Sequence, residues 1–199
     1  VKKLKMDADF IARIQAAMEL LDAVWQGTTP PDVLIDDFFR RRRYAGSSDR
    51  RAIQAQVYQV LRRRARLDWW VERTGINLEI SPRSRLIAAI TLVDRKAPDE
   101  LTKLFSGVRH CPQPFDDHEA ALAEALYGRP LNHRDMPAPV AYEFPAWMEP
   151  SFSALWGERL SEEIAALNQI APVDLRVNTL KSTREAARKA LADAFIKTE

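Results

Sequence analysis

Apolar residues recur at intervals of three and four near the start of the chain, which is the period of an amphipathic helix. The positions that share this face are Phe10, Ile14, Met18, Leu21 and Trp25. They predict a helix over residues 7–25, and Gly27 ends it. Pro30 and Pro31 forbid its continuation, and Pro31 suits the first turn of a second helix over residues 32–41.

A third helix is predicted over residues 49–73, after a turn at Gly46, Ser47 and Ser48. At about 100° per residue, one side of this helix is apolar: Ile53, Val57, Val60, Leu67 and Val71. The opposite side interleaves arginines with two aromatic rings: Arg51, Tyr58, Arg62, Arg66, Trp69 and Arg73. Arg64 points toward the apolar side, so it needs a carboxylate or a helix-end partner, or the helix bends there.

The remaining pattern up to residue 128 is also helical. Helices are predicted over residues 81–95, 98–105 and 117–128, with a loop at 107–115. No strand pattern precedes residue 140. Five to seven helices joined by short connections indicate an all-α bundle over residues 7–128.

The pattern changes after residue 128. Prolines interrupt residues 129–144 and predict a linker, and residues 145–169 hold one or two helices. The alternation at residues 173–179 then predicts a strand, and Ser182 with Glu185 forms a capping box that opens a helix to about Ala194. A single strand with one helix cannot pair its edges, so we expect the chain to be a fragment of a longer protein.

Composition places the chain among ordinary globular proteins. Its 199 residues are 46% hydrophobic and 29% charged, which excludes collagen and broad disorder. No apolar run approaches the ~18 residues that span a bilayer. The single cysteine excludes a disulfide framework, so we expect a cytoplasmic protein. Without a sustained heptad pattern, we expect a monomer.

Positive charge is concentrated in one region. Between Arg40 and Arg73 there are eleven arginines and three acids, a net +8 that leaves −6 for the rest of a chain whose total is +2. Guanidinium groups suit phosphates and stack on bases, and aromatic rings among them offer further stacking surfaces. This pattern favours a nucleic-acid-binding face. Two other interpretations remain open: the arginines form a solvated surface with internal ion pairs, or Tyr58 and Trp69 cover a neighbouring helix while the arginines extend over them.

No motif for catalysis is present. The sequence has no G-x-G-x-x-G, no P-loop and no H-E-x-x-H. His110, Cys111 and His118 could form a metal site only with a fourth ligand, which the sequence does not offer. A nucleophilic cysteine needs an adjacent base, and the sequence gives little sign of one near Cys111. We therefore assign no catalytic, cofactor-binding or metal-binding residue to this chain.

Four short motifs resemble one protein family. They are the Arg-Tyr-x-Gly-Ser-x-Asp-Arg-Arg turn at 43–51, the Val-Tyr-x-Val-Leu-Arg-Arg-Arg helix at 57–64, Phe-Pro-x-Trp-Met at 144–148 and Leu-Arg-Val-Asn-Thr at 175–179. Their order is similar to that in the N-terminal region of the Sun/Fmu (RsmB) type of bacterial RNA cytosine-C5 methyltransferases. Ala45 and Ala65 depart from the family pattern, and the family's glycine-rich cofactor segment and its two catalytic cysteines are not found in this sequence.

The resemblance implies a non-catalytic N-terminal fragment of an S-adenosylmethionine-dependent methyltransferase of 16S rRNA or tRNA. It implies a NusB-like helical domain that binds RNA over residues 7–128, a linker over 129–144, and the start of a small α/β subdomain over 145–199. S-adenosylmethionine is expected in the C-terminal domain that this chain lacks. Residues that we expect to contact RNA, ribosomal in this interpretation, are Arg40, Arg41, Arg42, Arg43, Arg51, Tyr58, Arg62, Arg66, Trp69 and Arg73, with Arg176 and Asn178 on the polar face of the predicted strand.

Two alternatives belong to other functional classes. In the first alternative, the chain is a stand-alone binding module. It is then either a NusB-type RNA-binding transcription factor or a protein-docking module whose basic face meets an acidic partner. Alternatively the bundle only braces a catalytic module, and its arginines pair with acids such as Asp36, Asp37, Asp68 and Glu72.

Overall fold

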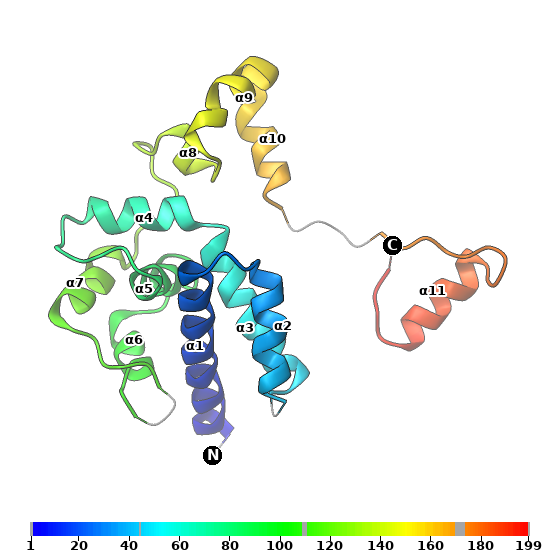
Figure 1. The fold of residues 1–199 in the computed structure, drawn as a ribbon, viewed down its shortest axis with the longest axis horizontal. Coiled ribbons are helices and arrows are strands. Elements are labelled where there is room, and N and C mark those ends of the chain that lie inside the picture. The colour runs from blue at the N-terminus through cyan, green and yellow to red at the C-terminus, as the bar shows by residue number, and fades with distance from the viewer. Residues whose placement is uncertain (1, 44, 109–110, 170–173, 199) are drawn as a thin grey trace. The chain divides into compact units, whose positions relative to one another are not determined.

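A computed structural model describes residues 2–43, 45–108, 111–169 and 174–198, with the backbone alone at residues 2–10. The chain divides into two compact units between Ala165 and Ala166. Within the described residues every regular element is a helix, so the predicted all-α class is confirmed for the first unit (Figure 1). None of these helices is long and apolar enough to cross a membrane.

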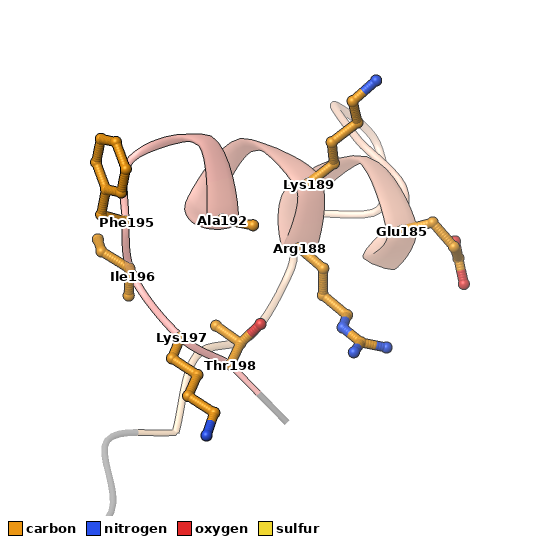
Figure 2. Close-up of a pocket in the computed structure, with 8 residues that line it drawn as sticks. All are labelled: Glu185, Arg188, Lys189, Ala192, Phe195, Ile196, Lys197 and Thr198. Carbon is orange, nitrogen blue, oxygen red and sulfur yellow. The ribbon is translucent and has the colours of Figure 1, made fainter.

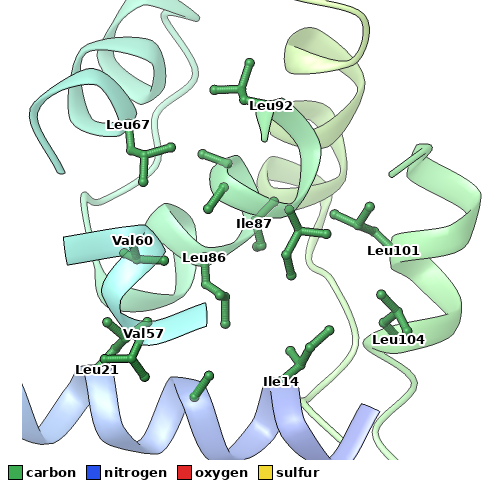
Figure 3. Packing of buried hydrophobic residues seen from close by; sticks show 14 of the residues in the cluster. Ile14, Leu21, Val57, Val60, Leu67, Leu86, Ile87, Leu92, Leu101 and Leu104 are labelled. Atoms are coloured by element: carbon green, nitrogen blue, oxygen red, sulfur yellow. The ribbon is translucent and has the colours of Figure 1, made fainter. Parts of the chain in front are cut away.

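The first unit is built around one buried helix. α5 (Pro82–Leu92) starts at Pro82, and a capping box between Ser81 and Ser84 fixes its N-terminus. Every residue from Ser84 to Leu92 is buried, because helices pack around the whole circumference of α5. Figure 3 shows Leu86 and Ile87 of this helix among apolar side chains of its neighbours.

The helices around α5 follow the predicted order. They are α1 (Lys2–Gln26), α2 (Pro31–Arg41), α3 (Ser47–Leu61), α4 (Arg64–Arg73), α6 (Pro98–Leu104) and α7 (Asp117–Leu126). Helices α1, α3, α4, α6 and α7 contact α5 directly, whereas α2 packs on α1. The apolar positions at helical spacing form the shared core, with Ile14, Leu21, Val57, Leu67 and Leu122 almost fully buried.

The predicted single helix over residues 49–73 is wrong, because it is two helices. Arg62 ends α3, and Arg63 leaves the helical conformation with φ −121° and ψ 18° before α4 begins at Arg64. The break changes the direction of the chain, so that α3 packs mainly on α1 while α4 packs on α5. A helical wheel drawn through both segments therefore does not describe one continuous face.

The segment predicted as a linker is packed against α4. We call residues 131–144 the strap. It contains the short helix α8 (Ala138–Ala141), and Met136, Pro139 and Phe144 are buried. The Trp70 indole Nε1 donates a hydrogen bond to the Leu131 carbonyl at 2.9 Å. The strap therefore belongs to the first unit rather than forming a free connection.

Short helices follow the strap, as predicted for residues 145–169. They are η1 (Ala146–Met148), α9 (Glu149–Trp156), η2 (Gly157–Arg159) and α10 (Leu160–Leu167). The ring of Phe144 meets that of Phe152 edge to face, with centroids 5.3 Å apart, and the ring of Phe152 lies tilted against that of Trp156 at 4.8 Å. Trp147, by contrast, is 78% exposed.

The second unit holds α11 (Arg184–Asp193). The predicted strand is not formed at residues 174–178, which have no regular secondary structure, and Val173 lies outside the described residues. A strand needs a partner for its hydrogen bonds, and the described part of the chain contains no other strand. The predicted cap is shifted by one residue: the Thr183 hydroxyl, not that of Ser182, accepts from the Ala186 N–H at 3.2 Å.

Candidate nucleic-acid interface

The helix break divides the predicted arginine face into two regions. Arg40, Arg41, Arg42, Arg43 and Arg51 lie at the α2–α3 end of the bundle. Arg66, Trp69 and Arg73 lie on α4, beside the strap. Tyr58 and Arg62 lie at the end of α3, where the Arg62 guanidinium lies 5.2 Å from the centre of the Tyr58 ring.

A groove separates α2 from α3, which lie next to each other in Figure 1. Its volume is about 520 Å³, and its lining combines three arginines with polar side chains and one ring: Asp36, Phe39, Arg40, Ser47, Arg50, Arg51 and Gln54. The turn between Arg41 and Ser47 is short, so the end of α2 lies close to the start of α3. Spacings of three, four and seven residues place all the lining residues of α3 on the side that faces α2.

The arginines of this groove keep much of their donor capacity. The Arg40 side chain is 71% exposed and pairs with Asp37 at 2.9 Å. The Nε atoms of Arg50 and Arg51 donate to the carbonyl oxygens of Ala45 at 2.9 Å and Ser47 at 3.3 Å. A guanidinium carries five N–H donors, so one such bond leaves several for a ligand. Arg50 is not among the residues that the sequence pattern selects for RNA contact, although its position beside Arg51 near the start of a helix is a signal for it.

The other arginines of the run differ in their surroundings. Arg42 is held by Glu19 at 2.7 Å and lies over the Phe38 ring at 3.8 Å, so it is largely a structural group. Arg41 and Arg43 are exposed. Tyr44, which belongs to the motif at 43–51, lies outside the described residues. The groove and these two exposed arginines form one basic surface, which we call the α2–α3 surface.

The arginines of α4 are engaged by the strap. The Arg66 Nε donates to Glu143 at 2.9 Å, and its Nη1 donates to Asn132 at 2.8 Å. Arg73 pairs with Asp135 at 2.8 Å. The Trp69 ring lies against the His133 ring, with centroids 5.3 Å apart. This face of α4 therefore covers a neighbouring segment, in line with one of the alternatives that the sequence left open.

Glu143 also caps α4. Its carboxylate accepts hydrogen bonds from the backbone N–H groups of Ala65 at 2.8 Å and Arg66 at 3.1 Å, near the N-terminus of the helix. The side chain is 7% exposed, and Glu143 has a positive φ of 59°, a backbone region that disfavours residues with a Cβ atom. Burial raises the pKa of the Glu143 carboxyl, although Arg66 and the two backbone N–H groups oppose that shift.

The sequence predicts that Arg64 has a carboxylate partner or lies at a bend in the helix, and the structure shows both. The helix breaks immediately before it, and its Nε lies 3.6 Å from the Asp68 carboxylate. Asp68 also accepts two hydrogen bonds from the almost buried Arg85, at 2.6 Å and 3.0 Å. Both guanidinium groups lie over the Trp25 ring, Arg85 at 4.4 Å and Arg64 at 5.5 Å. Of the acids that we considered as ion-pair partners, Asp37 and Asp68 have this role.

Arg176 and Asn178 lie in the second unit, in the irregular segment that precedes α11, and both are exposed. The Asn178 side-chain oxygen accepts from the Leu180 N–H at 3.0 Å, so this residue stabilises a local turn. The same unit has a hollow of about 610 Å³ between α11 and residues 195–198. Figure 2 shows Arg188 and Lys197 at this hollow with the exposed ring of Phe195.

The part of the chain that the structure describes contains no group of three residues suited to hold a metal ion. His118 is exposed at the start of α7, and Cys111 is half-buried. Arg109 and His110, which precede Cys111 in the sequence, lie outside the described residues.

Comparisons with known proteins match both parts of the chain. Residues 144–199 match a family model described as the RsmF/B-like methyltransferase ferredoxin-like domain. Over 212 residues the chain is 24% identical to the Probable ribosomal RNA small subunit methyltransferase B of Synechocystis sp.. That alignment covers 94% of this chain and 46% of the relative, so the chain spans about half the length of the relative. No solved structure gives a significant match. These matches agree with the resemblance of the sequence motifs to the Sun/Fmu (RsmB) type of RNA methyltransferase family.

Proposed function

We propose that this chain is the non-catalytic N-terminal part of an S-adenosylmethionine-dependent cytosine-C5 methyltransferase of 16S rRNA, and that its helical unit is NusB-like and binds RNA. One observation supports the RNA-binding role most directly: three arginines line an open groove between α2 and α3, beside two further exposed arginines. Between Arg40 and Arg51 the sequence has six arginines and a single acid, Asp49. Such a surface attracts phosphates and accelerates encounter with RNA.

The α4 region is the weaker candidate for RNA contact. Arg66 is 16% exposed at its side chain and its charge is balanced by Glu143, while Arg73 is paired with Asp135. An RNA phosphate would have to displace carboxylates that are already well placed. We infer that α4 holds the strap and so braces the segment that follows it, whereas the α2–α3 surface meets RNA.

The test measures binding of the full chain to a 16S rRNA fragment as a function of salt concentration. Arg41→Glu with Arg43→Glu reverses two exposed charges of the α2–α3 surface, and Lys103→Glu with Arg129→Glu makes the same net change at exposed positions elsewhere. We expect the first pair to weaken binding at least tenfold more than the control pair. If both side chains contact phosphates, the log–log salt slope falls by about 1.4 to 1.8 units. Equal affinities for the two variants would remove this surface from the proposal.

A further inference from the structure

The groove between α2 and α3 carries more than positive charge. Its lining includes the carboxylate of Asp36 and the amide of Gln54, in addition to Arg40, Arg50 and Arg51. A site that only neutralises a phosphodiester backbone gains nothing from a carboxylate, because a carboxylate repels phosphate. The groove therefore has the composition of a site for a ligand with both an anionic group and hydrogen-bond donors.

The two neighbouring acids of α2 have different environments. Asp37 pairs with Arg40 at 2.9 Å. Asp36 lines the groove, is exposed, and forms no ion pair with any described residue. The carboxylate of Asp36 is thus available as an acceptor, while Asp37 holds the Arg40 guanidinium at the edge of the same groove.

We infer that this groove binds a single unpaired RNA nucleotide whose base carries an exocyclic amino group, an inference that rests on the proposed RNA-binding role. Arg40 and Arg51 hold the phosphate, and the Ser47 hydroxyl offers an additional donor. Asp36 accepts a hydrogen bond from the amino group of cytosine, adenine or guanine, and the Gln54 amide pairs with a neighbouring donor or acceptor on the base edge. Uracil has no amino group and leaves the Asp36 carboxylate without a donor.

The size of the site agrees with this ligand. A volume of about 520 Å³ falls in the range of small-ligand pockets. The side chain of Phe39 is 4% exposed, and the Arg50 guanidinium lies 5.6 Å from the centre of its ring. The floor of the groove is therefore packed, and only its polar rim is free to contact a ligand. In an A-form duplex the Watson–Crick edges are paired, so a duplex presents no base edge to such a groove.

The experiment uses the full chain and three RNA probes at one salt concentration: a 12-nucleotide oligocytidine, a 12-nucleotide oligouridine, and a 12-base-pair duplex. We expect the wild-type chain to bind oligocytidine at least fivefold more tightly than the other two. Asp36→Ala, which removes the acceptor for the amino group, is expected to reduce this preference to below twofold. Gln113→Ala, at an exposed position outside the groove, is expected to keep it.

The outcomes separate this inference from the proposed function. If the wild-type chain binds none of the three RNAs and no 16S rRNA fragment, the RNA-binding proposal itself fails. If it binds all three equally, or if Asp36→Ala keeps the full preference for oligocytidine while its circular dichroism is unchanged, RNA binding stands and the nucleotide site is overturned.

Discussion

Glu143 and Arg66 are joined by two hydrogen bonds across 77 residues of sequence: the Glu143 Oε1 atom accepts from both the backbone N–H and the side-chain Nε of Arg66, at 3.1 Å and 2.9 Å. One carboxylate thus caps a helix and neutralises an arginine at the same time. This contact ties the end of the strap to the start of α4, immediately before the segment that matches the methyltransferase family model.

Removing the Glu143 carboxylate should destabilise the first unit. Glu143→Ala leaves the largely buried Arg66 without its counter-ion and two helix N–H groups without an acceptor, so we expect the free energy of unfolding to fall by about 2 to 4 kcal/mol. Urea denaturation followed by circular dichroism measures this loss. Glu124→Ala, at an exposed position of α7, is the control and should change stability by less than about 0.5 kcal/mol.

The positive φ of Glu143 supplies a matched comparison. Glycine adopts a φ of 59° without steric cost, whereas alanine does not. Both substitutions remove the carboxylate, so the difference between their free energies of unfolding reports the cost of the positive φ at this position. We expect Glu143→Gly to be about 0.5 to 1 kcal/mol more stable than Glu143→Ala in the same denaturation experiment. A less stable glycine variant would show that the strap does not hold this conformation in solution.

The pH dependence of stability should report on the same carboxyl group. Burial raises the pKa of Glu143 in the folded state above its usual 4.5, so the folded state binds the proton more tightly than the unfolded state. The contribution of this group to stability is therefore complete below pH 4.5 and is lost as pH rises through the raised pKa. Measured against Glu143→Gln, the relative stability of the wild-type chain should fall between pH 4 and pH 7. A relative stability that increases over that interval would mean a lowered pKa.

The pair formed by Asp68 and Arg85 is expected to show strong coupling. The Arg85 side chain is 6% exposed and has bidentate contact with Asp68, so Asp68→Ala leaves a buried charge and should cost about 3 kcal/mol. Combining it with Arg85→Met, which keeps contact with Trp25, should cost clearly less than the sum of the two single changes. A double-mutant cycle in urea measures this coupling, and additive losses would show that the two side chains act independently.

Arg51 and Arg66 should differ in their effect on RNA binding. Arg51 is exposed in the groove, so Arg51→Gln should lower the log–log salt slope by about 0.7 to 0.9 units. Arg66 is held by Glu143 and Asn132, so Arg66→Gln should reduce stability and leave the slope unchanged. Titration of a 16S rRNA fragment at several salt concentrations decides whether Arg66 contacts RNA, as its sequence position indicates, or anchors the strap.

Local sequence signals predict most of the helices. They do not predict that the helix expected over residues 49–73 is divided into α3 and α4. The apolar spacing from Ile53 to Val71 is that of one helix, and nothing within residues 49–73 shows that Glu143 caps a new start at Arg64. A helical wheel drawn for one helix cannot predict the groove either, because the residues that line it come from both α2 and α3. Alternation at residues 173–179 indicated a strand, but a strand forms only where a second strand accepts its hydrogen bonds.

The contact at Glu143 also removes the reach that residues 129–144 would have as a free linker. A free linker of the 16 residues 129–144 would behave as a coil with an end-to-end distance of roughly 20 Å, and fully extended it would reach about 55 Å. With Glu143 fixed on α4, that reach is removed. The chain from Phe144 to Ala165 then continues within the first unit. Breaking the Glu143–Arg66 ion pair alone would not restore that reach, because Trp70 and Arg73 still hold the strap through Leu131 and Asp135.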